Sequence, residues 1–340
     1  DASGAWGPWS DCQGQAECLI GSEREEACGP NGSGRRTQVC DASGTWGPWS
    51  DCQGVDECEN GATASGEDSC GIFLEGRILV DCINGQWEAT ETCSHEEMCA
   101  DLASHYQTNE TAPTEPPFWG TIFTTSELLD SNDPTSYDSL SYVGQGERIM
   151  YDRRVANWVT ETPHLFNVQF GAAKQIEFQV NPEFTREEAE REVVTYAGPI
   201  GRIPGFLLRD VETVWIHRGN NAFGGGNNNL LIHTEQGESY QSSGILEETF
   251  IHEATHTSVD QEHQDAPLWV LAQEMDGAWI SHYAQDYPQR EDLAESMLLY
   301  LAAVYWKELI SDELYETIVT TIPNRIRYFQ CQGFTSALLD

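Results

Sequence analysis

Two histidines and a glutamate in the segment 245–256, Ile-Leu-Glu-Glu-Thr-Phe-Ile-His-Glu-Ala-Thr-His, have the types and the spacing of a metal site. Apolar residues recur through this segment at helical spacing, so it predicts a helix. On a helix His252 and His256 present their imidazoles on one face, where one zinc ion can bridge them at about 2.0 to 2.1 Å. Glu253 lies beside them and can take a proton from metal-bound water. The segment therefore predicts a catalytic zinc site, with one ion per chain and Glu253 as general base.

A catalytic zinc ion needs a third protein ligand and an open position for water. Glu291 and Glu295, at the start of a further predicted helix, share one helix face at i and i+4. This pair can supply one carboxylate for the metal and one that supports the site. Asp260 lies about 12 Å beyond His252 along the same helix axis and is too far away to be the third ligand. We expect Asp260 to accept a hydrogen bond from a ligand histidine instead.

The order His-Glu-x-x-His, then Glu-x-x-x-Glu with Ala before the second Glu, resembles the gluzincin clan of metallopeptidases, and the lethal-factor-type families within it. The resemblance implies a zincin-like catalytic domain that hydrolyses peptide bonds. It also implies that Glu291 is the third ligand and that Glu295 supports it. In those families a tyrosine seven or eight residues before the ligand glutamate stabilises the oxyanion. Tyr283 matches this spacing, and Tyr287 is the second choice.

Two alternatives are weaker. A metzincin would have Gly at position 259 and His at position 262, but Val259 and Glu262 stand there, and His263 is one residue out of register. An extracellular adhesion or binding protein with an inert or structural zinc domain would have a site closed by four protein ligands and would not need Glu253. The sequence therefore favours a zinc metallopeptidase, of the endopeptidase kind, over the adhesion protein.

The sequence pattern from 119 to 340 indicates strands followed by helices, which predicts an α+β domain. Aromatic and β-branched runs predict strands at 120–125, 174–180, 211–218 and 230–234. Thr185, with Glu188 three residues on, predicts a helix start, and helical patterns follow at 245–258, 268–284, 290–309 and 312–321. The stretch 221–229 lacks the Lys-Ser/Thr of a phosphate loop and predicts a flexible turn. We expect the next strand to be the sheet edge that binds an extended substrate, through Leu230, Leu231, Ile232 and His233.

The first 99 residues contain an internal repeat of about 40 residues, because Trp6-Gly-Pro-Trp-Ser-Asp-Cys12 recurs from Trp46 to Cys52. The cysteines follow the repeat, which predicts units at 1–40 and 41–82, a partial unit at 83–99 and a linker at 100–118. Asp1-Ala-Ser-Gly matches the residues after Cys40, so we expect further repeats and a cysteine before residue 1. That cysteine would explain the odd total of 11. Alternatively, Cys331 pairs with a leftover repeat cysteine and staples the two domains.

The Trp-x-x-Trp-x-x-Cys starts and the Arg-Arg-Thr-Gln-Val-Cys end of the first unit resemble thrombospondin type 1 repeats. In that family tryptophans and arginines from neighbouring strands stack in layers, and the repeats bind matrix proteins or glycans. These units have four cysteines rather than six, so the family's disulfide pattern does not transfer. For this acidic version we expect a spacer or targeting role, with extracellular matrix or surface glycans as candidate partners.

Composition limits the location and the partners. Dense cysteines with few aliphatic residues indicate an oxidising compartment, so we expect a secreted, extracellular or cell-surface protein. The formal net charge is -39, from 56 acidic and 17 basic residues. Such a surface repels nucleic acid and anionic lipid, and no apolar stretch is long enough to insert into a membrane. A protein or peptide is therefore the expected substrate.

Overall fold

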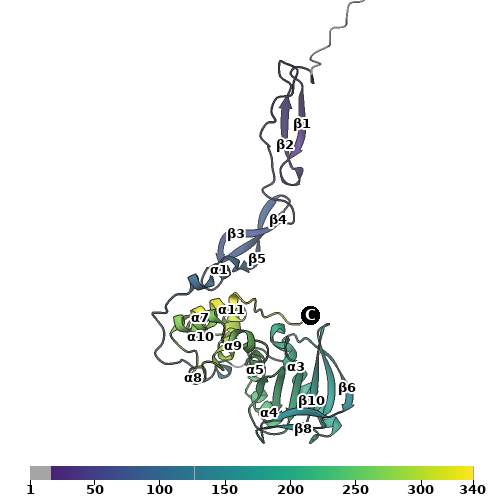
Figure 1. The fold of residues 1–340 in the computed structure, drawn as a ribbon, viewed down its shortest axis with the longest axis vertical. Helices are drawn as coiled ribbons and strands as arrows, with labels where there is room; N and C mark the ends of the chain where they lie inside the picture. The colour runs from purple at the N-terminus through teal and green to yellow at the C-terminus, as the bar shows by residue number, and fades with distance from the viewer. Residues whose placement is uncertain (1–16, 126, 340) are drawn as a thin grey trace, which may run out of the picture. The chain divides into compact units, whose positions relative to one another are not determined.

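The computed structural model describes residues 17–125 and 127–339, and the chain divides into two compact units (Figure 1). The first unit ends at Ser94, and its described residues form short strands and a 3-10 turn. The second begins at His95 and combines a mixed β-sheet with most of the helices. The fold is thus α+β behind a small-β region that carries several disulfides.

Disulfide bonds replace an apolar core in the first unit. It contains an antiparallel pair and a three-stranded antiparallel sheet, built from β1 (Glu23–Cys28), β2 (Gly34–Val39), β3 (Thr63–Cys70), β4 (Gly76–Ile83) and β5 (Gln86–Ser94). The cross-links are Cys18–Cys40, Cys28–Cys52, Cys58–Cys82 and Cys70–Cys93. The first and third bonds are equivalent under the sequence repeat, as are the second and fourth. The predicted repeat therefore reappears in the pairing, whereas Cys12 lies outside the described residues.

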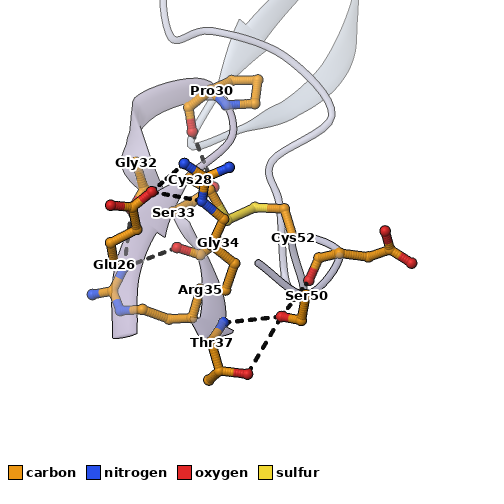
Figure 2. Close-up of a disulfide and its surroundings, with 12 residues drawn as sticks. Glu26, Cys28, Pro30, Gly32, Ser33, Gly34, Arg35, Thr37, Ser50 and Cys52 are labelled. Atoms are coloured by element: carbon orange, nitrogen blue, oxygen red, sulfur yellow. Dashed lines mark hydrogen bonds and ion pairs between the residues drawn. A yellow bond between two sulfur atoms is a disulfide. The ribbon is translucent and has the colours of Figure 1, made fainter. Parts of the chain in front are cut away.

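The bond between Cys28 and Cys52 joins one sequence unit to the next. Figure 2 shows this disulfide beside strand β2, where Thr37 N donates to Ser50 Oγ over 2.9 Å. A pattern of pairing across the unit boundary links consecutive units covalently, so neighbouring repeats cannot separate as independent modules. Five disulfides, including Cys99–Cys331 in the second unit, are typical of proteins from oxidising, non-cytoplasmic compartments.

Arginine and tryptophan side chains stack in the first unit. The guanidinium of Arg24 lies 4.4 Å from the ring centroid of Trp46 and 5.3 Å from that of Trp49. Arg36 lies 5.0 Å from the ring of Trp49. This layering adds cation–π attraction where there is little apolar burial.

A six-stranded mixed sheet forms one layer of the second unit. Its order is β12 (Gly224–Gly226), β13 (Asn229–His233), β11 (Thr213–His217), β10 (Lys174–Val180), β9 (His164–Phe170) and β6 (Tyr137–Gln145). Strand β11 runs parallel to β10 and β13, and the other pairs are antiparallel. A separate hairpin of β7 (Arg148–Asp152) and β8 (Asn157–Glu161) packs on the sheet through Met150, Trp215 and Leu231.

Three of the four predicted strands are present, at 174–180, 211–218 and 230–234, within a residue or two of their expected ends. The predicted strand at 120–125 is wrong, because Thr121–Phe123 forms a 3-10 turn. The prediction that 230–234 is the sheet edge is also wrong. The glycine strand β12 pairs with β13 and becomes the edge itself, so Leu230, Leu231, Ile232 and His233 are interior and buried.

Helices cover the sheet and form the rest of the second unit: α1 (Glu96–Ala100), α2 (Leu102–His105), α3 (Arg186–Arg202), α4 (Thr234–Ser242), α5 (Leu246–Ser258), α6 (Asp260–His263), α7 (Pro267–Asp276), α8 (His282–Asp286), α9 (Asp292–Tyr305), α10 (Asp312–Thr321) and α11 (Pro323–Gln330). Helices α3 and α5 contact each other and the sheet, as Figure 1 shows. The predicted start of α3 is confirmed, because Thr185 and Glu188 form a reciprocal capping box. Among the described residues no helix is long and apolar enough to cross a bilayer.

The predicted single helix at 268–284 is wrong. Helix α7 ends at Asp276 because Gly277 adopts a left-handed conformation with φ of 61°. The chain then continues without helix to Ser281, whose side chain caps α8 by accepting from Ala284 N. The break lets residues 118–119 pair with 281–283, so that two distant segments meet beside the site.

The stretch 100–118, predicted as a linker, belongs to the second unit and packs against the rest of it. Gln107 N donates to Asn324 Oδ1 over 3.0 Å, and Asn109 Nδ2 donates to Thr320 O over 2.7 Å. The Cys99–Cys331 disulfide fixes the start of this stretch to the end of α11. Cys331 therefore does pair with a repeat-region cysteine, but Cys99 belongs to the second compact unit, so the bond does not staple one unit to the other.

Candidate metal centre

Helix α5 positions the two histidines as predicted. Its buried side, which includes Phe250, Ile251 and Ala254, packs into the core and fixes the rotation of the helix. His252 and His256 consequently point the same way, and their Nε2 atoms lie 3.2 Å apart.

The start of α9 brings Glu291 to the same point. Glu291 Oε2 lies 3.1 Å from His256 Nε2 and 3.4 Å from His252 Nε2. One ligand atom from each of the three residues lies within 4.8 Å of the other two, so the group could hold a metal ion. The sequence placed these residues on separate helices, and the structure brings them together.

The spacing of these atoms suits a tetrahedral ion. Ligand atoms that stand about 2.0 to 2.1 Å from a tetrahedral zinc ion lie about 3.3 Å from one another. The three distances here are 3.1, 3.2 and 3.4 Å. Two imidazole nitrogens and one carboxylate oxygen are also a donor set that zinc accepts.

The electrostatics of the group favour a cation. Burial would lower the pKa of His256, but hydrogen bonds to Asp260 and Glu291 raise it to about 10. Burial would raise the pKa of Glu291, but its contacts with His252 and His256 hold that pKa well below the usual range. Positive charge is therefore stabilised at this point, and a metal ion can supply it in place of a proton.

The two predicted supporting carboxylates each meet a ligand histidine. His256 Nδ1 donates to Asp260 Oδ2 over 2.7 Å, at the junction of α5 and α6. His252 Nδ1 lies 3.4 Å from Glu295 Oε1, and the other oxygen of Glu295 accepts from Thr121 N over 2.8 Å. The hydrogen bond to Asp260 orients the His256 imidazole so that its Nε2 faces the shared point, and the Glu295 carboxylate lies beside the His252 ring.

Tyr283 rather than Tyr287 reaches the group. Tyr283 Oη donates to Glu291 Oε1 over 3.0 Å, and the ring lies beside that of His252. Burial and the Glu291 carboxylate raise the pKa of Tyr283 to about 12, so its hydroxyl stays protonated and able to donate. Tyr287 packs edge-on against Tyr283 and is not part of the pocket lining. His263 lies away from the metal group, and its Nδ1 forms a hydrogen bond of 2.7 Å with Tyr328 Oη.

The group lies in a pocket of about 640 Å³. Its lining combines the metal group with aromatic, glycine and arginine residues from several segments, including Trp119, Phe123, Arg153, Phe223, Gly224, Gly225, Tyr240 and Glu253. Among the described residues, none forms a hydrogen bond or ion pair with the Glu253 carboxylate, which is half-buried. Glu253 therefore faces the pocket with both oxygens available.

Part of the stretch 221–229, predicted as a flexible turn, is instead strand β12, and residues 222–226 line this pocket. A Cβ at Gly225 would lie 1.8 Å from the carbonyl oxygen of Glu253, so only glycine lets the strand pass this close to α5. Gly226 N donates to Thr257 Oγ1 over 2.8 Å, which ties the strand to the helix. The edge strand thus lies directly against the turn of α5 that carries the site.

Sequence reasoning missed the rest of the lining. Trp119, Arg153 and Tyr240 come from a 3-10 turn region, a hairpin and α4, with no common spacing that would relate them to α5. Only the unusual run of three glycines was visible as a signal, because consecutive glycines mark a close approach of the backbone to another element.

Glu248, one turn before the histidines, makes stability depend on pH. Its side chain is fully buried and accepts from Leu128 N over 2.7 Å, and burial raises its pKa from 4.5 to about 7. Between these values the folded protein holds a proton that the unfolded chain has released, so stability falls as pH rises. The free energy of unfolding should fall by up to about 3 kcal/mol across this range.

We expect Glu248→Gln to lack this part of the pH dependence, because a neutral amide still accepts from Leu128 N. Urea unfolding of both proteins at pH 5 and pH 7.5, with a chelator present so that metal binding does not contribute, measures the difference. An identical pH dependence in the two proteins would contradict the assignment.

Comparison with protein-family models, with curated proteins and with solved structures finds no match to this chain. The structure itself defines the class: an α+β domain with a His-His-Glu group at the base of a pocket, behind a disulfide-linked small-β region.

Proposed function

We propose that this chain is a secreted zinc metallopeptidase. The observation that carries the proposal is the convergence of His252, His256 and Glu291 in an open pocket, with the uncommitted carboxylate of Glu253 beside them. A structural metal site would be closed by a fourth protein ligand, whereas this group faces a cavity large enough for part of a peptide.

Zinc is the proposed metal because the donor set and the interatomic spacing suit it. His252, His256 and Glu291 would hold the ion, and Asp260 and Glu295 would keep the two imidazoles in the binding orientation. When bound, zinc supplies a water of lowered pKa and polarises the scissile carbonyl.

The residues around the metal group would carry out proton transfer, oxyanion stabilisation and substrate binding. Glu253 would accept the proton of the attacking water and deliver it to the leaving amine. Tyr283 would donate its hydroxyl hydrogen to the developing oxyanion, since its high pKa keeps it protonated. The outer edge of β12 offers backbone groups with which an extended peptide can pair as an added strand.

The first unit would act as a spacer or targeting module outside the cell. Its disulfides connect consecutive repeats and suit an oxidising environment. The many acidic residues make a polyanionic glycan a less favourable partner than a matrix protein.

Metal analysis combined with hydrolysis tests the proposal. We expect the purified full chain to contain one zinc ion and to cleave peptides in a mixed library. Glu291→Ala should lose most of the metal, because a buried ligand oxygen is removed, whereas Glu274→Ala, an exposed carboxylate on α7, should retain it. Elemental analysis after dialysis measures both.

Absence of zinc from the wild type, or unchanged zinc in Glu291→Ala, would reject the metal site. A wild-type protein that contains zinc but cleaves no peptide would instead favour the alternative hypothesis, an extracellular adhesion protein whose metal domain is inert.

A further inference from the structure

Arg153 is a cation in the pocket that the proposed chemistry does not use. It follows strand β7, and its Nη2 atom lies 2.7 Å from the position of a Cβ at Gly224, so its side chain lies over the edge strand β12. It is half-buried and lines the same pocket as His252 and Glu253.

Among the described residues, the guanidinium of Arg153 has no anionic partner. Within the part of the chain that the structure describes, no hydrogen bond, ion pair or cation–π contact of this side chain is found. The neighbouring Arg154 contrasts with it, because Arg154 binds Asp152 at 2.9 Å and Glu183 at 2.8 Å. Arg290, the other arginine of the pocket, is 2.7 Å from Glu291.

This difference is informative in such an acidic protein. With 56 acidic and 17 basic residues, carboxylates are available to nearly any arginine. A guanidinium offers five N–H donors in a planar fork that matches a carboxylate, and a half-buried one gains most from an incoming anion. The donors of Arg153 are therefore free for a ligand in the pocket.

The alternation of β12 relates Arg153 to helix α5, which carries the metal group. A Cβ at Gly225 would point at the backbone of Glu253 on α5, whereas a Cβ at the preceding residue, Gly224, would point to the opposite face of the sheet, at Arg153. A peptide added to this edge also alternates, with successive side chains pointing to the two faces. One residue would then face the metal group while its neighbour faces Arg153.

We propose that Arg153 recognises a substrate carboxylate next to the residue that occupies the metal side of the pocket. The inference rests on the proposed peptidase function and adds a substrate class to it, namely peptides with an acidic group adjacent to the cleavage point. That group is an Asp or Glu side chain, or the carboxylate of a chain end.

Cleavage-site profiling of a proteome-derived peptide library tests the preference. We expect wild type to select Asp, Glu or a free C-terminus at one position next to the cleaved bond. Arg153→Ala should lower cleavage of such peptides by about 10- to 100-fold, the effect of losing a charge-assisted hydrogen bond. Arg153→Glu should shift the preference to Lys and Arg, whereas Arg191→Ala, an exposed arginine on α3, should change nothing.

A binding measurement separates this inference from the proposed function. The Glu253→Gln protein, immobilised, is incubated with the same library, and retained peptides are compared with those retained by Glu253→Gln/Arg153→Ala. Acidic peptides retained only when Arg153 is present support carboxylate recognition even if no protein cleaves. Cleavage without an acidic preference overturns the inference and leaves the peptidase function intact.

Two synthetic changes to the best-retained peptide identify the source of the carboxylate. If Glu→Gln or Asp→Asn weakens fluorescence-anisotropy binding by about 10-fold or more, the side chain is the ligand. If amidation of the C-terminus does so, the chain end is the ligand. If neither change weakens binding, or if both proteins, with and without Arg153, lose the same binding affinity, the assignment of Arg153 to carboxylate recognition is rejected.

Discussion

Replacing Glu253 with Gln is expected to lower peptide hydrolysis by about 10²- to 10⁴-fold without releasing the metal. Gln occupies nearly the same volume but cannot accept and return a proton. Glu253 lines the pocket beside the metal group but is not one of its three ligand candidates, so metal content should be unchanged. The measurement is kcat on the most rapidly cleaved library peptide, with elemental analysis of the same samples.

Glu248→Gln is the matched control, because it changes a buried carboxylate of the same helix that accepts from Leu128 N and does not line the pocket. It should retain activity close to that of wild type. Full activity in Glu253→Gln would exclude Glu253 as the general base and would assign proton transfer to another group.

Loss of Arg325 is expected to have the largest effect on stability. Its side chain is fully buried, with Nε 3.0 Å from Asp292 Oδ2 and Nη1 3.6 Å from Asp276 Oδ2. Both nitrogens of its fork donate to Ala278 O over 3.0 Å. Arg325→Met leaves two buried carboxylates without a cation, which costs about 3 to 5 kcal/mol.

The ion cluster also adjoins the site, because Asp292 directly follows Glu291, the proposed third ligand. We therefore expect Arg325→Met to weaken metal retention as well as to lower the urea midpoint of the second unit. The exposed Arg191→Met on α3 should do neither. Because Arg325→Met alone can fail to fold, the triple variant Arg325→Met/Asp276→Asn/Asp292→Asn provides a second measurement.

The triple variant removes the uncompensated charges and should recover much of the lost stability. If it is as unstable as Arg325→Met, the effect comes from lost packing around Trp269 and Trp279 rather than from charge. If Arg325→Met itself unfolds like wild type, the cluster does not hold α7, α9 and α11 together.

Local rules determined several features in advance. The capping box at Thr185 and the apolar stripe of α5 depend on residues within one or two turns, so their geometry follows from spacing alone. The i, i+4 histidines and the acidic pair at the start of α9 were visible for the same reason. The cysteines also follow the predicted sequence repeat, whereas their pairing came only from the structure.

Other features depend on contacts between distant segments. The sequence identified residues 230–234 as a strand, but whether that strand lies at the edge depended on the glycine segment before it, which pairs with it only because Gly225 can approach α5. The same packing brings Arg153 to the pocket and Arg325 between two aspartates, and neither shares a local pattern with its partners.

The sequence by itself therefore determined the starts of α3 and α5, the ligand candidates and the cysteine-rich repeats, because periodicity and capping act over a few residues. Tertiary structure alone decided the edge strand, the partner of Cys331 and the lining of the pocket. These depend on close packing between segments separated by tens to hundreds of residues, where the size of one side chain decides which surfaces meet.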